Sequence, residues 1–231
     1  MAESVERILI LLHDDDAGPG NLAAWLDERR IPWELADVRR EPLPPVSHRR
    51  ALVVLGSRES AYDRTVPWLD AEREFVAATA ATGTPVLGLC FGGQLLAQVM
   101  GGSVAAAEEM ERGWTAVRAT SGAGQDAELF GRTWLAWHYD NITPPPDATV
   151  LARSDRCVQA FTIGPHLGLQ FHPEATGTEI RAWRISDSDL PEDSPETLEL
   201  MRLTERHEAD AREAAGRLYA YFLAGLERTS A

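Results

Sequence analysis

The segment Pro85-Val86-Leu87-Gly88-Leu89-Cys90-Phe91-Gly92-Gly93-Gln94 joins a short apolar run to a cysteine and a pair of glycines. We expect a buried strand over residues 85–89, a tight turn at Cys90 and a helix over 94–100. Such a turn projects a reactive side chain out of a sheet, and the glycines allow substrate and backbone to come close. The positive end of the following helix favours a thiolate. Taken alone, Cys90 fits a buried, inert core cysteine equally well.

A second apolar run, residues 167–171, ends in His172-Pro173-Glu174. A thiolate nucleophile needs a base beside it, and the base needs an orienting group. Residues two apart in an extended chain share a face, so Glu174 is placed to hold the His172 ring while its other nitrogen faces Cys90. The two segments together predict a Cys-His-Glu triad. A metal site built from His172, Glu174 and His138 is the alternative, but the cysteine makes nucleophilic catalysis simpler. We expect neither a metal nor a cofactor.

Short apolar runs alternate with helical patterns along the chain, which is typical of βαβ units and a mostly parallel sheet flanked by helices. Strands are expected over 7–13, 33–38, 51–56, 85–89, 115–119, 133–137, 150–152, 158–163 and 167–171. Helices are expected over 21–29 with Asn21 as its cap, 68–81, 94–100, 178–183 and 195–226, the last with Leu198, Met201, Leu218, Phe222 and Leu226 facing the body. Residues 186–195 form an acidic loop. The length of 231 residues fits one α/β domain, 1–231, with a C-terminal helical extension from about residue 176.

The formal net charge of −14 argues against nucleic acid or anionic membranes as partners. All 22 basic residues are arginines, which excludes a Schiff-base or P-loop lysine. Two cysteines are too few for a disulfide framework. No apolar stretch approaches the ~20 residues that span a bilayer, and the run 8–12 is too short for a secretory leader. We therefore expect a cytoplasmic protein.

Residues 88–94 together with 170–174 resemble the class I, or triad, glutamine amidotransferases. The similarity runs from about Ile8 to Glu174 and is greatest to stand-alone members similar to the amidotransferase part of GMP synthase, without the synthase portion. Residues 53–56 are similar to the family's strand and oxyanion loop. Further similar segments are 57–72, 95–104, Glu111-Arg112-Gly113-Trp114 and Trp137-His138-Tyr139-Asp140. The resemblance implies a flavodoxin-like architecture. It also implies hydrolysis of the side-chain amide of L-glutamine through a γ-glutamyl thioester, with ammonia passing to a separate synthase.

The resemblance also assigns roles around the triad. The backbone N–H groups of Phe91 and Gly56 would hold the oxyanion. Contacts to the substrate would come from Gln94, Ser57, His138, Tyr139 and Asp140. Without the resemblance, Gln94 reads as a helix-surface residue, and His138 and Asp140 read as polar ends of a strand.

One position departs from the family pattern, because the oxyanion loop usually carries two glycines and here Ser57 follows Gly56. Serine does not adopt positive φ as cheaply as glycine. We therefore hypothesise that the loop rests in an inactive arrangement until a partner synthase binds.

Two alternatives remain open at this point. The first is a hydrolase or transferase of other γ-glutamyl amides or peptides with the same triad. The second is a non-enzymatic regulatory module, against which the intact Cys90, His172 and Glu174 argue. No residue indicates the acceptor of the ammonia. Structural or surface roles are expected for Cys157, His13, His48, His166 and His207.

Overall fold

The computed structural model of the chain describes residues 6–47 and 49–229, with side chains up to residue 225. The acidic N-terminal residues 1–5, His48 and the side chain of Leu226 lie outside this description. Within it, no helix combines the length and the apolar character that crossing a membrane requires.

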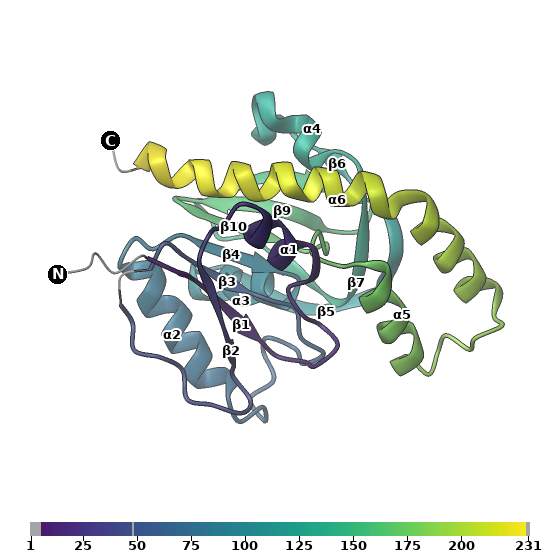
Figure 1. The fold of residues 1–231 in the computed structure, drawn as a ribbon, viewed down its shortest axis with the longest axis horizontal. Helices are drawn as coiled ribbons and strands as arrows, with labels where there is room; N and C mark the ends of the chain where they lie inside the picture. The colour runs from purple at the N-terminus through teal and green to yellow at the C-terminus, as the bar shows by residue number, and fades with distance from the viewer. Residues whose placement is uncertain (1–5, 48, 230–231) are drawn as a thin grey trace.

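An eight-stranded sheet forms the centre of the molecule (Figure 1), in the order β2-β1-β3-β4-β10-β9-β8-β6. The neighbours from β2 to β10 pair in parallel, and β9, β8 and β6 continue the sheet with antiparallel pairings. The strands are β1 Ile8–Leu12, β2 Trp33–Asp37, β3 Ala51–Val54, β4 Val86–Leu89, β6 Arg118–Ala119, β8 Thr149–Arg153, β9 Val158–Ile163 and β10 His166–Leu169. The predicted α/β class with a mostly parallel sheet is confirmed.

A second, two-stranded sheet pairs β5 Ser103–Ala116 with β7 Thr133–Thr143. The expected strand 115–119 was wrong, because it covers only the end of β5 and the short β6. The expected strand 133–137 covers less than half of β7. The reason lies in β5, whose alanines and glutamates have low strand propensity. Pairing with β7 overrides that propensity across a bulge between Ala106 and Glu111.

Helices cover both faces of the central sheet. On one face, α1 Gly20–Glu28 and α6 Pro195–Thr229 pack over a core that contains Leu26, Leu218 and Phe222. On the other, α2 Leu69–Ala81 and α3 Phe91–Val99 pack over a second core. Figure 1 shows α6 running along the sheet, and its N-terminal half extending beyond the sheet beside α5 Gly177–Ser186. A 3-10 turn, Ser121–Asp126, leads into the short helix α4 Ala127–Phe130.

Three local expectations were wrong. Helix α1 begins at Gly20 after Pro19, so Asn21 is not its cap. Instead, the Asn21 side chain donates a hydrogen bond of 3.0 Å to the Ala175 carbonyl, which ties α1 to the segment after β10. Helix α3 begins at Phe91 and not at residue 94. The side chain of Leu198 is 61% exposed, and at this end of α6 it is Leu200, 6% exposed, that faces the body.

Candidate functional site

Cys90 occupies the single-residue turn between β4 and α3. Its backbone has φ 50° and ψ −106°, a strained conformation for a residue with a side chain. Two hydrogen bonds fix the turn: the Cys90 N–H donates to the Leu169 carbonyl at 2.8 Å, and its carbonyl accepts from the Gln94 N–H at 3.0 Å. The turn therefore contains a single residue, Cys90, and α3 begins at the next position.

The glycines around the turn are required by close backbone contacts. A Cβ on Gly92 would lie 2.0 Å from the Val54 carbonyl oxygen, and one on Gly93 would lie 2.4 Å from that of Leu169. These contacts bring the first turn of α3 against β3 and β10. The N-terminal end of the helix is thereby held next to the cysteine sulfur.

His172 and Glu174 lie just beyond the end of β10. The His172 N–H donates to the Leu135 carbonyl at 2.8 Å, which anchors the segment to β7. The His172 Nδ1 atom lies 2.7 Å from Glu174 Oε1, and both side chains are buried. The other ring nitrogen, Nε2, has no hydrogen-bond partner among the described residues.

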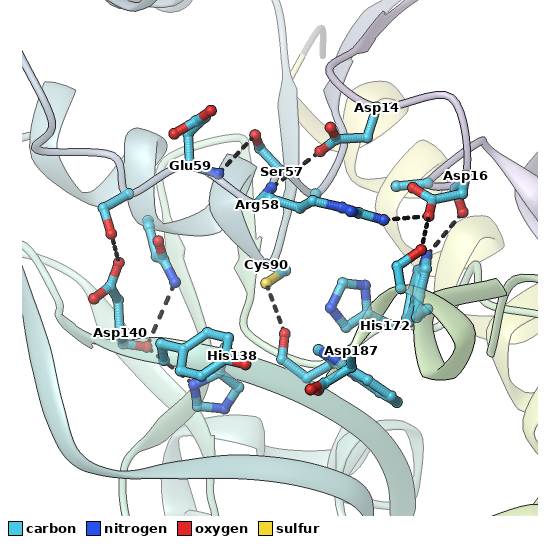
Figure 2. A pocket seen from close by; sticks show the side chains of 18 of the residues that line it. Asp14, Asp16, Ser57, Arg58, Glu59, Cys90, His138, Asp140, His172 and Asp187 are labelled. Atoms are coloured by element: carbon cyan, nitrogen blue, oxygen red, sulfur yellow. Dashed lines mark hydrogen bonds and ion pairs between the residues drawn. The ribbon is translucent and has the colours of Figure 1, made fainter. Parts of the chain in front are cut away.

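The histidine ring and the cysteine both lie next to Gly56. A Cβ built on Gly56 would be 3.2 Å from His172 Cε1 and 3.9 Å from Cys90 Cβ. Figure 2 shows the Cys90 sulfur and the His172 ring facing the same pocket. Complete burial of the ring acts to lower the pKa of His172, but the adjacent Cys90 and Glu174 outweigh burial and raise that pKa well above its ordinary value. A proton that passes from Cys90 to this ring is thus stabilised by both neighbours.

The pocket above these residues has a volume of about 360 Å³, within the range of small-molecule sites. Eight predicted site residues line it: Cys90, His172, Gly56, Ser57, Gln94, His138, Tyr139 and Asp140. Glu174 and the Phe91 side chain lie behind its wall. The structure therefore brings together predicted site residues from four separate segments of the sequence.

Gln94 and Asp140 are joined at the floor of the pocket. Gln94 is 3% exposed, so it is not a helix-surface residue, and its Nε2 donates to the Asp140 carbonyl at 3.4 Å. The Asp140 carboxylate accepts hydrogen bonds from Ser60 Oγ at 2.6 Å and Tyr62 OH at 3.0 Å. Tyr139, by contrast, is 56% exposed at the pocket rim. Asp140 lies within β7, so it is not the polar end of a strand.

His138 belongs to a buried network beneath the pocket. Its Nδ1 lies 3.0 Å from the Asp140 carbonyl, and its Nε2 lies 3.1 Å from Oε2 of Glu111, the residue opposite it on β5. The Cys157 thiol donates to the same carboxylate at 3.5 Å, and the Gln159 amide donates to it at 2.6 Å. Burial acts to raise the pKa of Glu111, but hydrogen bonds outweigh it, with that from His138 first, and the pKa is lowered.

These contacts bear on where a metal could bind. Ligand atoms of Glu111, His138 and Cys157 lie within 4.8 Å of one another, whereas the alternative drawn from sequence grouped His138 with His172 and Glu174. Burial, followed by the Glu111 charge, raises the pKa of Cys157 to about 12. The neutral thiol donates its hydrogen bond to the Glu111 carboxylate. The three groups already satisfy one another.

The oxyanion loop is fixed on its buried side by two accepted hydrogen bonds. The Leu55 carbonyl accepts from the Gly92 N–H at 3.2 Å, and the Gly56 carbonyl lies 3.1 Å from His13 Nδ1. In a trans peptide the C=O and the following N–H point in opposite directions. The Gly56 N–H therefore points away from α3, and the Ser57 N–H points away from His13. Among described residues, positive φ without glycine occurs at Arg30 and Cys90, so Ser57 carries no such strain.

Three N–H groups of the cysteine turn and the oxyanion loop, those of Gly56, Ser57 and Phe91, have no acceptor in the described part of the chain. That of Phe91 is at the first position of α3. The next loop N–H groups are used, since that of Arg58 donates to Asp14 at 3.0 Å and that of Glu59 donates to Ser57 Oγ at 3.1 Å. The loop thus leaves its Ser57 donor available to a ligand.

Segments that the sequence analysis did not assign to the site form the outer wall. Trp183 of α5 packs on the His172 ring with centroids 4.8 Å apart, and its Nε1 donates to the Asp16 carbonyl at 2.8 Å. Asp187 and Asp189 follow α5 and line the pocket, so the acidic loop is part of the site. A capping box between Thr176 and Glu179 begins α5 here. The sequence predicts the helix 178–183 and the acidic loop 186–195, but it gives no sign that they meet the pocket.

Residues 39–188 match the family described as glutamine amidotransferase class-I. The chain belongs to this family of enzymes. A glutamine amidotransferase from Methylobacillus flagellatus and one from Thermotoga maritima are similar in structure. Each has a TM-score of 0.86 and 26% identity over 96% of this chain, covering 96% and 99% of theirs. The predicted flavodoxin-like architecture of class I amidotransferases is thereby confirmed.

Curated relatives are glutamine-hydrolysing GMP synthases. That of Thermomicrobium roseum is 36% identical over 135 residues, which is 57% of this chain and 24% of the relative. That of Caldanaerobacter subterraneus subsp. tengcongensis is 32% identical over 160 residues, which is 65% of this chain and 29% of the relative. The chain thus spans less than a third of the length of these relatives. The similarity to GMP synthase expected from the motifs is confirmed.

Proposed function

We propose that this amidotransferase hydrolyses the side-chain amide of L-glutamine and releases ammonia for a separate synthase. The observation that carries the proposal is the free His172 Nε2, which faces the Cys90 pocket while Glu174 holds Nδ1 at 2.7 Å. A base with one nitrogen oriented and the other unoccupied is what a thiol nucleophile requires.

The chemistry follows from these positions. The Cys90 sulfur attacks the amide carbon while His172 takes the thiol proton, and the imidazolium then protonates the departing ammonia. Water, deprotonated by His172, attacks the γ-glutamyl thioester and releases glutamate and the thiol. Glu174 keeps the Nδ1 proton in place and stabilises the imidazolium.

The oxyanion of each tetrahedral intermediate needs two donors. The free Phe91 N–H follows the nucleophile directly. From the loop we assign the Ser57 N–H in place of the Gly56 N–H, because the Gly56 peptide points its donor away from α3. One such donor is typically worth about 3–4 kcal/mol of barrier.

Replacement of the nucleophile tests the assignment. Cys90→Ala and Cys90→Ser should abolish release of glutamate from L-glutamine while thermal unfolding stays within a few degrees of wild type. Hydrolysis that survives in either folded variant would overturn the triad. Copurification from a cell extract, followed by ammonia-dependent assays of the captured protein, would identify the synthase. A reducing compartment such as the cytoplasm suits the thiol.

A second candidate substrate is a γ-glutamyl amide larger than glutamine. The outer wall favours it, because Asp14, Asp16, Asp187 and Asp189 line the pocket beyond the sulfur. Asp16 pairs with Arg58 and Asp187 with Arg112, and among the described residues Asp14 and Asp189 have no ion pair. Such a wall suits an amide substituent that carries a positive charge. A kcat/KM for a γ-glutamyl diamine well above that for glutamine would establish this candidate, and the reverse order would remove it.

A further inference from the structure

His13 lies behind the oxyanion loop, at the carboxyl end of β1. Leu9, Leu11 and His13 alternate along the strand and so face α2 and α3. The His13 side chain is 1% exposed, and it does not line the pocket. A buried histidine with no contact to substrate must be explained by what its two nitrogens hold.

One nitrogen holds the loop. His13 Nδ1 lies 3.1 Å from the Gly56 carbonyl oxygen, and because a carbonyl only accepts, Nδ1 must carry the proton. The other nitrogen holds α2, since Nε2 lies 2.8 Å from Oε1 of Glu72, which is 0% exposed. This second contact also needs a proton between its two atoms. Glu72 therefore fixes the ring with Nδ1–H aimed at the loop.

The ring cannot turn away from the loop. Trp68 packs on it with centroids 5.2 Å apart, and Phe91 packs on it at 4.9 Å. Phe91 is also the residue whose N–H is the other proposed oxyanion donor. The same side chains therefore fix the relative position of the two oxyanion donors.

We propose that His13, held by Glu72, is a positioning residue that keeps the Gly56–Ser57 peptide oriented with the Ser57 N–H toward the pocket. Without the accepted hydrogen bond on Gly56, this peptide is free to rotate and to withdraw its donor. The hypothesis drawn from the sequence was that backbone strain at Ser57 controls whether the oxyanion loop is active. The contacts indicate instead that the orientation of the Gly56–Ser57 peptide, set by His13, controls it. The inference rests on the proposed amide hydrolysis.

The test compares His13→Ala, His13→Asn and His13→Gln. Asparagine places an amide N–H where Nδ1 lies, and glutamine places it nearer Nε2, so the pair distinguishes a donor to the loop from simple filling of space. We expect His13→Ala to lower kcat for glutamine about 10- to 300-fold, which is less than the ~10²- to 10³-fold cost of an oxyanion donor removed outright, because a rotating peptide still presents its N–H part of the time. KM should change less than about twofold, and asparagine should recover more activity than glutamine.

Alkylation of Cys90 by iodoacetamide separates positioning from general damage, because displacement at that reagent's carbon forms no oxyanion. Its rate should be unchanged in His13→Ala. His166→Ala is the matched control: it removes another buried histidine, which accepts the Val86 N–H at 3.2 Å away from the pocket. Its kcat should stay at the wild-type level.

Three results would overturn the inference: a kcat within twofold of wild type in His13→Ala, no advantage of asparagine over glutamine, or alkylation that falls in step with kcat. Crystal structures of the wild type and His13→Ala give a readout independent of activity. We expect the Gly56 carbonyl to turn from its wild-type direction, and an unchanged peptide would also overturn the role of His13. Absence of glutamine hydrolysis in the wild type would overturn the proposed function alone, and the peptide orientation would still decide the role of His13.

Discussion

Replacement of Glu174 by glutamine is the sharpest perturbation of the triad, because it removes the charge and preserves the size. Glu174 is 3% exposed, its Oε1 lies 2.7 Å from His172 Nδ1, and its Oε2 has no partner among the described residues. The new amide must therefore place either its oxygen or its NH₂ group against the ring, with the other in the unpartnered position.

The two orientations differ in free energy and in chemistry. With the amide oxygen on Nδ1, the NH₂ group is buried without an acceptor, which costs about 1–3 kcal/mol. With NH₂ on Nδ1, the ring proton moves to Nε2, and this nitrogen no longer accepts the Cys90 proton. In that orientation the amide oxygen occupies the unpartnered position, so neither orientation satisfies both groups and a share of the molecules is held in the inactive form. Because the imidazolium also loses its carboxylate, and carboxylate-to-amide changes in triads cost up to about 10⁴, we expect kcat to fall by about 10² to 10⁴.

The assay is formation of glutamate at saturating L-glutamine, with unfolding followed by circular dichroism. The pKa of His172 should also fall, because Glu174 is one of the two groups that raise it against burial. Glu213→Gln, at an exposed site on α6, is the control and should keep wild-type activity. A folded Glu174→Gln protein with more than a tenth of the wild-type kcat would refute the role of Glu174 as orienter.

Two further predictions test the turn and the thiols. Gly92→Ala should lower the melting temperature and remove activity, because its Cβ would lie 2.0 Å from the Val54 carbonyl oxygen, and clashes with backbone exceed the usual 1–3 kcal/mol or so of overpacking. Gly18→Ala, where a Cβ meets nothing within 4 Å, is the control, and equal melting temperatures would contradict the packing argument. At pH 8, iodoacetamide should label Cys90 and spare Cys157, because burial and a neighbouring carboxylate raise the Cys157 pKa to about 12 and leave the thiol neutral. Peptide mapping by mass spectrometry measures this, and equal labelling of both cysteines would show the second thiol to be accessible and ionised.

The parts of the site that sequence reasoning predicted are those encoded by neighbouring residues. The cysteine turn depends on contacts within residues 88–94 and on two adjacent strands. His172 and Glu174 are two residues apart, so their pairing follows from local geometry. Parallel pairing of β4 with β10 then places both segments at the same end of the sheet. The local sequence around Cys90 and His172, together with the pairing of β4 and β10, is enough to predict this part of the site.

The parts that were missed depend on contacts between distant segments. Glu72 is 59 residues from His13 and lies on a helix whose charged surface pattern gives no sign of a buried carboxylate. Glu111 meets His138 because they are opposite one another on β5 and β7, and low strand propensity concealed β5. The wall formed by Asp187 follows from the packing of α5 on the pocket, which the acidic composition of that segment did not indicate.

The structure contains three buried His–Glu pairs near the pocket, and their chemistry distinguishes them. In His13 and His138, the second ring nitrogen faces a backbone carbonyl, at 3.1 Å and 3.0 Å. Both nitrogens of each of these rings therefore have hydrogen-bond partners, and neither ring has a nitrogen free to accept a proton. In His172 the second nitrogen is buried, faces the Cys90 pocket and has no partner among the described residues. Proton transfer needs a nitrogen that is free to accept, so of the three histidines His172 is the one that fits the proposed base, and the other two hold the oxyanion loop and the Asp140 strand around it.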